Sequence, residues 1–198
     1  MIATDDDRIS ALCKTIGAKV IKTRPDHPSG TDRIAEAAQQ CEAASHVINI
    51  QGDEPLLEPE LVDTLARELR EDSNIPMITA GSPLDDPELL ADSNIVKLVI
   101  DRNQNALYFS RSPIPFRRSD TPSLPTYRHL GLYGYRVAFL KHFITLPPSA
   151  LETAEGLEQL RALENGATIR VHLTEHEAIG LDSPDQIPLI ESLLALSQ

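Results

Sequence analysis

The sequence is short of three features that mark common classes of protein. It has no tryptophan, and aromatic residues make up 4% of its 198 residues, so the stacking platforms that bind single-stranded nucleic acid are not expected. Its formal net charge of −12 disfavours broad contact with nucleic acid or anionic membranes. No apolar run approaches the roughly 20 residues that cross a bilayer. We therefore expect neither a nucleic-acid-binding nor a membrane protein, while a nucleotide substrate, which needs only a local group of donors and a metal ion, is compatible with this composition.

Cysteine is also scarce. Cys13 and Cys41 stand far apart and form no CxxC pair. Such cysteines are typical of buried or half-buried thiols in a reducing compartment rather than of a disulfide or a metal site. The N-terminus carries no basic-then-apolar leader, which makes a cytoplasmic location the expectation. The length suits one domain with a sizeable core, and no linker or repeat divides residues 1–198.

Short apolar runs alternate with amphipathic stretches, which is typical of an α/β fold. Residues 1–4 resemble the tail of a strand that should have begun earlier, although a short edge strand explains them equally well. Residues 112–125 carry four prolines and predict a long loop of the kind that is often functional. The pattern predicts strands at 18–21, 46–50, 77–80, 95–100, 106–110, 129–136 and 168–173, and helices at 7–16, 31–40, 58–70, 151–164 and from about 184.

Two aspartates follow or precede these elements at places that suit a metal ion. Asp53, in Gln51-Gly52-Asp53-Glu54-Pro55, comes just after the strand predicted at 46–50. Ligands of open α/β sheets gather beyond the carboxyl ends of strands, and Mg²⁺ is usually bound by one or two carboxylates plus substrate phosphates. Asp182 stands before the last predicted helix, where it could supply a second carboxylate. The competing interpretation is that each aspartate only caps the helix that follows it.

The segment 26–33, Asp-His-Pro-Ser-Gly-Thr-Asp-Arg, joins a predicted strand to a predicted helix. Its small and hydroxyl residues leave backbone N–H groups that suit a phosphate or the polar edge of a base. Ordinary capping of the helix by Ser29 or Thr31 explains most of the same pattern. The segment has neither the GxGxxG nor the P-loop spacing.

Arginines gather around the proline-rich loop. Arg111, Arg117 and Arg118 flank or lie in it, and Arg128 follows it. In an acidic protein a local basic cluster suggests a carboxylate or phosphate ligand, because the arginine fork matches both. A solvated loop with counter-charges is the alternative.

Four further polar residues have no distinctive pattern around them. His129 and Tyr133 are consistent with ordinary residues of a strand, and Glu158 and Gln159 with the surface of a helix. Their local sequence alone therefore assigns them no chemical role.

Taken together, these segments closely resemble the CMP-KDO synthetases, the 3-deoxy-manno-octulosonate (KDO) cytidylyltransferases of lipopolysaccharide biosynthesis. The resemblance runs over almost the whole chain in the right order, so it is more specific than any one motif. It is carried by Ile2-Ala3-Thr4-Asp5-Asp6, residues 27–33, Ile50-Gln51-Gly52-Asp53-Glu54-Pro55, Leu107-Tyr108-Phe109-Ser110-Arg111, residues 128–136, Leu157-Glu158-Gln159-Leu160-Arg161 and Leu181-Asp182-Ser183-Pro184.

The resemblance implies a glycosyltransferase-A-like α/β fold, that of the nucleotide-diphospho-sugar transferases, with a mixed sheet flanked by helices and its first strand missing or incomplete here. It implies a homodimer that converts CTP and KDO to CMP-KDO and pyrophosphate with Mg²⁺. Asp53 and Asp182 correspond to the metal carboxylates, and Gln51 to a residue where sugar and nucleotide meet. Thr4, Asp5, Ser29, Gly30 and Thr31 correspond to the nucleotide pocket, and Arg111, Arg118, His129, Tyr133, Glu158 and Gln159 to the residues that bind the acidic sugar.

The sequence departs from the family at its beginning. The family opens with a strand and a loop of the form Pro-Ala-Arg-x-x-Ser-x-Arg-Leu-Pro-Gly-Lys that holds the triphosphate, and no segment here matches it. Each charge-assisted hydrogen bond contributes roughly 1.5–3 kcal/mol, so we expect weak or no activity from residues 1–198 alone. Two alternatives are a sialic acid (acylneuraminate) cytidylyltransferase and a non-catalytic remnant that binds a nucleotide, a sugar or a partner chain.

Overall fold

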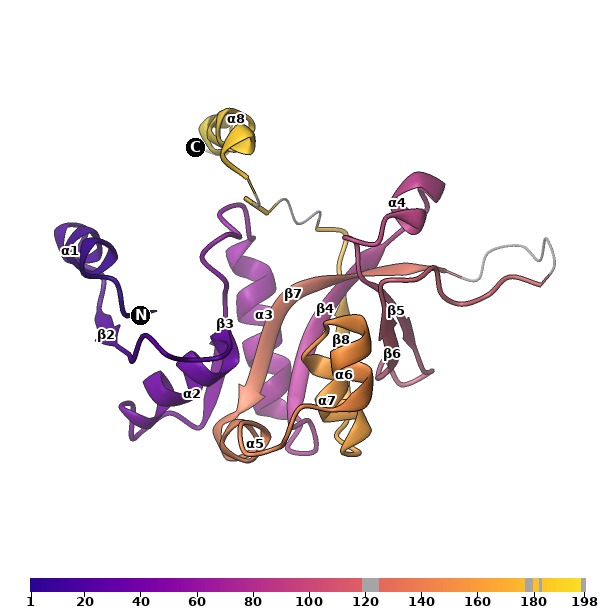
Figure 1. Cartoon of the computed structure of the whole chain (residues 1–198), viewed down its shortest axis with the longest axis horizontal. Helices are drawn as coiled ribbons and strands as arrows, with labels where there is room; N and C mark the ends of the chain where they lie inside the picture. Colours follow the sequence, from indigo (N-terminus) through magenta and orange to yellow (C-terminus); the bar gives the residue numbers. More distant parts are fainter. Residues whose placement is uncertain (119–124, 177–179, 182, 197–198) are drawn as a thin grey trace.

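The computed structural model describes residues 1–118, 125–176, 180–181 and 183–196. Its strands form a six-stranded mixed sheet and a separate two-stranded parallel sheet (Figure 1). The small sheet pairs β1 (Ile2–Thr4) with β2 (Val20–Lys22). The large sheet contains β3 (His46–Asn49), β4 (Met77–Pro83), β5 (Lys97–Ile100), β6 (Ala106–Ser110), β7 (Tyr127–Arg136) and β8 (Ile169–Leu173).

Helices cover both faces of the large sheet (Figure 1). Leucines of α3 pack against one face, and residues of α2, α5 and α7 belong to the core on the other. The α-helices are α1 (Asp7–Thr15), α2 (Gly30–Gln39), α3 (Pro59–Glu71), α4 (Pro87–Ala91), α5 (Val137–Phe143), α6 (Ala150–Glu155), α7 (Gln159–Glu164) and α8 (Ile187–Leu196), the last preceded by the 3-10 turn η1 (Pro184–Gln186).

Strand β7 organises the large sheet. It runs antiparallel to β3, β4 and β5, and β4 in turn pairs in parallel with β8. Packing around its end is so tight that a Cβ on Gly134 would lie 2.6 Å from Ile78 Cγ2 and 2.7 Å from Ile48 Cδ1, so glycine is required there. The register between β4 and β7 shifts between Thr79 and Ala80, so two residues of β7 bulge out of the ladder.

Most predicted elements are confirmed, with ends displaced by a few residues. The predicted strand 106–110 coincides with β6, and the predicted helix 58–70 is α3. The single helix predicted over 151–164 is wrong, because Gly156 adopts a left-handed conformation with φ of 63° and separates α6 from α7. Helices α4 and α5 were not predicted.

The first strand is short, as the sequence indicated. β1 has three residues and pairs with β2, and among the described residues no strand ladder connects this pair to the large sheet. Helix α2 contacts both β1 and β3 and so spans the two sheets. The two cysteines are free thiols, Cys13 buried and Cys41 half-buried, as expected. No helix in the described ranges has the length and apolar character needed to cross a membrane.

Candidate active site

The loop after β3 carries the predicted metal ligand. Asp53 is exposed in a turn of this loop, and it does not cap α3, whose N-cap is Glu58. The backbone N–H of Leu181 donates to the carbonyl oxygen of Asp53 at 2.8 Å. The backbone of Leu181 is thereby held at the Asp53 loop, and Asp182 lies outside the described residues.

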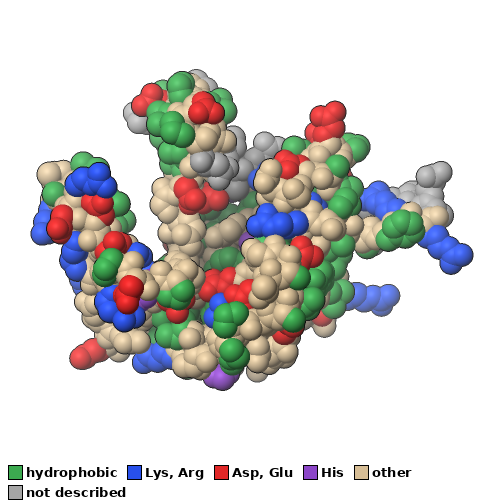
Figure 2. All heavy atoms as spheres, viewed as in Figure 1, with side chains coloured by type: hydrophobic (Ala, Val, Ile, Leu, Met, Phe, Trp, Pro, Cys, Tyr) green, Lys and Arg blue, Asp and Glu red, His purple; other side chains and the backbone are tan. Residues whose placement is uncertain are grey.

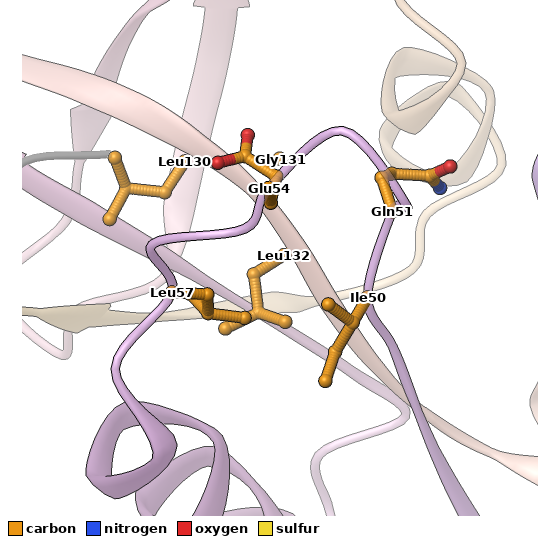
Figure 3. Close-up of a pocket in the computed structure, with 7 residues that line it drawn as sticks. All are labelled: Ile50, Gln51, Glu54, Leu57, Leu130, Gly131 and Leu132. Atoms are coloured by element: carbon orange, nitrogen blue, oxygen red, sulfur yellow. The ribbon is translucent and has the colours of Figure 1, made fainter. Parts of the chain in front are cut away.

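The same loop rests on apolar side chains and reaches two other parts of the site. Figure 3 shows Ile50, Leu57 and Leu132 packed beneath it, with Glu54 directed toward Gly131 of β7 and Gln51 turned away from this group. The Gln51 amide lies beside α2, because a Cβ on Gly30 would come within 3.2 Å of Gln51 Nε2. Gln51 and Gly30, which were predicted to belong to one site, are therefore neighbours.

The start of α2 is joined to α7 by one carboxylate. Ser29 is the N-cap of α2, and its Oγ accepts a hydrogen bond from the N–H of Asp32 at 3.2 Å. Ser29 Oγ lies 3.0 Å from Glu158 Oε1, and Thr31 Oγ1 donates to Glu158 Oε2 at 2.6 Å. Arg161 Nη2 lies 3.6 Å from the same carboxylate. Ser29 therefore caps α2. In addition, Ser29 and Thr31, which were predicted to bind the nucleotide, contact Glu158, which was predicted to bind the sugar.

The β1–α1 turn is attached to the same helix. Arg33 of α2 forms an ion pair with Asp5, with Nη1 and Oδ1 2.7 Å apart. Thr4 is buried, and its Oγ1 accepts from the N–H of Asp6 at 3.1 Å. Of the predicted nucleotide residues, Asp5 is therefore held next to α2 by a side-chain contact, and Thr4 is buried in the same turn.

An aromatic row on β7 leads from this junction into the sheet. His129 and Tyr133 have ring centroids 5.2 Å apart, and Tyr133 and Tyr135 stack at 6.0 Å. Phe109 meets the His129 ring edge-on at 5.1 Å. Burial lowers the pKa of His129 to about 3 and raises the pKa of Tyr133, so both rings are neutral near pH 7.

Two buried polar atoms at this place have no hydrogen-bond partner among the described residues. They are the hydroxyl oxygen of Tyr133 and the side-chain nitrogen Nε2 of Gln159. Gln159 is 5% exposed at the first residue of α7, next to Glu158. A buried donor without a partner costs roughly 1–3 kcal/mol, and native structures keep few of them. These two atoms are therefore available to a polar ligand.

A cavity of about 760 Å³ opens beside His129. One of its walls is the loop between α4 and β5, and the other is the first half of β7. Its lining residues are Asp92, Asn94, Ile95, Val96, Arg128, His129 and Gly131.

The predicted arginines are less closely associated with this group. Arg111 is held by backbone carbonyls, with Nε donating to Glu155 O at 2.8 Å and Nη1 to Ser93 O at 3.0 Å. The Ser93 contact attaches it to the loop that lines the cavity. Arg118 is exposed at the edge of the described part of the proline-rich loop.

Two residues at the site were not predicted. Thr79 of β4 hydrogen-bonds with His129, and Lys97 of β5 donates to the carbonyls of Asp92 and Ile95 in the cavity wall. Both are fully buried polar residues within otherwise apolar strands. A lone polar residue in an apolar run is the sequence signal that could have identified them.

The geometry is compatible with a magnesium ion at Asp53. The Asp53 carboxylate is exposed and has no ion-pair partner within the described ranges, which leaves its oxygens free for a hard cation. In the same ranges no group of three or more His, Cys, Asp or Glu side chains could hold a metal by itself. Asp53 with one further carboxylate and substrate phosphates fits Mg²⁺, which commonly retains water ligands.

Comparison with known proteins identifies the family of the chain. The cytidylyltransferase family model matches residues 1–169. The 3-deoxy-manno-octulosonate cytidylyltransferase of Solibacter usitatus (strain Ellin6076) is 46% identical over 197 residues, which cover 100% of this chain and 78% of that protein. The enzyme of the same name from Acaryochloris marina (strain MBIC 11017) is 46% identical over 198 residues, covering 100% and 80%.

Two solved structures resemble the chain, one in sequence and fold and the other in fold alone. A structure of CMP:2-keto-3-deoxy-manno-octonic acid synthetase complexed with CTP matches with a TM-score of 0.93 and 38% identity, covering 98% of this chain and 79% of that chain. A putative glucose-1-phosphate thymidylyltransferase from Bacillus anthracis, at 12% identity, a TM-score of 0.60 and coverage of 94% and 70%, shares the fold.

The mixed sheet flanked by helices, with its polar site beyond β3, is the fold of a nucleotidyltransferase. The chain belongs to the cytidylyltransferase family, in the group of the 3-deoxy-manno-octulosonate cytidylyltransferases. The predicted fold class is confirmed, and the named relatives do not favour the sialic acid alternative.

Proposed function

We propose that this chain transfers the cytidylyl group of CTP to KDO and releases pyrophosphate. The observation that carries the proposal is the contact of Ser29 and Thr31 with Glu158, because it joins the segment predicted to bind the nucleotide to the segment predicted to bind the sugar. The relatives from Solibacter usitatus and Acaryochloris marina match all of the chain, and both are named 3-deoxy-manno-octulosonate cytidylyltransferase.

The nucleotide end of the proposed site is the start of α2 with the β1–α1 turn. Ser29, Gly30 and Thr31 present backbone and hydroxyl groups, and the N-terminus of a helix favours groups of negative charge. The Arg33–Asp5 ion pair fixes the turn against this helix. Gln51, next to Gly30, lies where the nucleotide and the sugar would meet.

The sugar end is formed by β7 and the start of α7. Tyr133 and Gln159 offer the two buried polar atoms without partners, and a polyhydroxylated acid supplies many donors and acceptors. His129 lines the adjoining cavity. Arg111, Arg118 and Glu158 complete the proposed set, with the arginines suited to the sugar carboxylate.

Asp53 and Asp182 are the proposed ligands of Mg²⁺. When bound, the ion would lower the pKa of a coordinated hydroxyl and neutralise charge that develops on the phosphate. The chain's own contribution would be to bring these two aspartates together, and the hydrogen bond from Leu181 N–H to Asp53 O supports this.

The reaction requires little covalent chemistry from the protein. The anomeric hydroxyl of KDO attacks the α-phosphorus of CTP, a new P–O bond forms, and the bond from that phosphorus to the oxygen bridging to the β-phosphate breaks. Pyrophosphate leaves with that electron pair, and the hydroxyl proton is lost to solvent. Catalysis then depends on holding the two substrates in line and on stabilising charge.

Titration calorimetry of KDO and of CTP, each with Mg²⁺, tests the proposal. Because a carboxylate–hydroxyl junction is lost, Glu158→Gln should weaken KDO binding by about tenfold or more. Glu71→Gln, an exposed change at the end of α3, is the matched control and should bind like the wild type. The proposal is wrong if the wild type binds CTP but not KDO, or binds N-acetylneuraminate more tightly than KDO.

The homodimer and the cytoplasmic location implied by the resemblance stay predictions. Sedimentation of the purified protein would test the first, and cell fractionation the second.

A further inference from the structure

Thr79 is a fully buried hydroxyl residue in the middle of β4. Its Oγ1 lies 2.8 Å from the carbonyl oxygen of Leu132, 3.2 Å from that of Leu130 and 3.0 Å from His129 Nε2. All three partners belong to β7, at the place where its register with β4 shifts. The hydroxyl therefore stands at the bulge, within hydrogen-bond distance of two β7 carbonyl oxygens.

A threonine hydroxyl has one proton to donate, and a carbonyl oxygen can only accept. If that proton went to His129 Nε2, both Leu130 and Leu132 oxygens would face Thr79 Oγ1 lone pair to lone pair, at 3.2 and 2.8 Å. The favourable arrangement is that Thr79 donates to Leu132 and accepts from His129. His129 must then carry its proton on Nε2, and in a neutral ring its Nδ1 is an acceptor.

We infer that Thr79 fixes His129 as the Nε2–H tautomer, so that Nδ1 accepts a hydrogen bond from a hydroxyl group of the bound sugar. This inference rests on the proposed function for the identity of the ligand. Thr79 is in this view a positioning residue, because it acts on the sugar only through His129.

The surroundings of His129 support a neutral ring. Phe109 and Tyr133 lie against it, at centroid distances of 5.1 and 5.2 Å, and both are uncharged. Burial disfavours the imidazolium form. His129 also lines the 760 Å³ cavity, which gives a ligand access to this residue.

Long-range ¹⁵N–¹H correlation spectra distinguish the two neutral tautomers of a histidine and need no substrate. Comparison with His129→Gln assigns the signals among the six histidines of the chain. We expect the Nε2–H pattern for His129 in the wild type and in Thr79→Ser, which keeps the hydroxyl. Thr79→Val, which keeps the shape and removes the hydroxyl, should move population to the Nδ1–H form.

The role of Thr79 is contradicted if wild-type His129 carries its proton on Nδ1, or if a folded Thr79→Val keeps the wild-type pattern. If Thr79→Val does not fold, Thr79→Ala, which also removes the hydroxyl, takes its place in the comparison. Merely structural damage would not produce a change of tautomer that serine rescues.

KDO affinity tests the second half of the inference. Thr79→Val should bind KDO about tenfold more weakly, while Thr79→Ser stays close to the wild type and CTP binding changes in neither. Equal loss of both ligands would contradict the positioning role. A wild type with the expected tautomer but no affinity for KDO would contradict the proposed function, and with it the sugar as the ligand of Nδ1.

Discussion

Asp53 is placed by its neighbours rather than by its own contacts. Its backbone carbonyl is bound by Leu181, while its carboxylate is exposed in a turn. A carboxylate of this kind adds little to folding, because exposed charges in water contribute weakly unless they are paired. The role that we propose for this carboxylate is to bind a cation.

Asp53→Asn keeps the size of the side chain and removes its charge. Measured against the weak activity expected of residues 1–198, KDO-dependent release of pyrophosphate should fall to the rate without protein, because a carboxylate ligand of the metal is lost. The melting temperature should stay within about one degree, since surface changes of this kind are nearly neutral. Asp63→Asn, exposed on α3, is the control and should leave both quantities unchanged. Full activity of Asp53→Asn would disprove the metal role.

His129 makes folding stability depend on pH. Its native pKa of about 3 lies below the usual value of 6.5, so as pH falls the unfolded chain takes up a proton that the native ring does not. The stabilising contribution is present above pH 6.5 and is lost between pH 6.5 and about 3. In urea titrations across this range, wild type should lose more unfolding free energy than His129→Gln does. Parallel curves for the two proteins would contradict this.

At the scale of elements, the wall of the cavity is held by one buried lysine. Lys97 is fully buried, and its Nζ donates to Asp92 O at 2.8 Å and Ile95 O at 2.7 Å, with a third contact to Arg111 O. Burial lowers the pKa of Lys97, and the carbonyl acceptors compensate part of the loss of water. The α4–β5 loop and the start of the proline-rich loop are thus attached to one cation.

Replacement of this lysine by Met should be costly. Lys97→Met leaves the carbonyls that it contacts without their donor, which predicts a loss of about 2–4 kcal/mol in unfolding free energy. Lys141→Met changes net charge equally at an exposed position of α5 and should change stability by less than about 0.5 kcal/mol. Urea denaturation of the two variants gives the comparison, and a Lys97→Met protein as stable as wild type would show that the carbonyls find other donors.

Elements with strong periodicity could be predicted from the sequence, whereas their interruptions could not. Strand β6 and helix α3 follow from apolar alternation and from Pro59 at the first turn. The break between α6 and α7 depends on Gly156 taking a left-handed conformation, which Gly in a helical pattern permits but does not require. The bulge in β7 depends on pairing with β4, a long-range contact that periodicity does not contain.

At the scale of the whole molecule, the site is assembled from segments distant in the sequence. Figure 2 shows the α1, α4 and α8 regions projecting from the body, with an open gap between the α1 and α8 regions. The residues found together come from the start of α2, the loop after β3, strand β7 and the start of α7. The resemblance to a family named these residues, while their side-chain partners, such as Thr79 for His129, required the fold.

The arrangement of the proposed site also explains how a negatively charged protein could bind a negatively charged ligand. A formal charge of −12 repels polyanions at a distance, so binding must come from local donors. The donors that we propose are those of helix α2, of the arginines near the proline-rich loop and of the buried groups of Tyr133 and Gln159. Binding of CTP or KDO should therefore strengthen rather than weaken when Mg²⁺ is added, which calorimetry at two metal concentrations can check.

Inter-ligand NOE spectroscopy with KDO, CMP and Mg²⁺ tests most directly whether one site holds nucleotide and sugar side by side. CMP does not react, so the measurement is independent of the rate of turnover. We predict transferred NOEs between protons of KDO and the ribose of CMP, which are reduced in Glu158→Gln. Binding of both ligands without any NOE between them would place them in separate sites and would contradict the proposed cytidylyltransferase site.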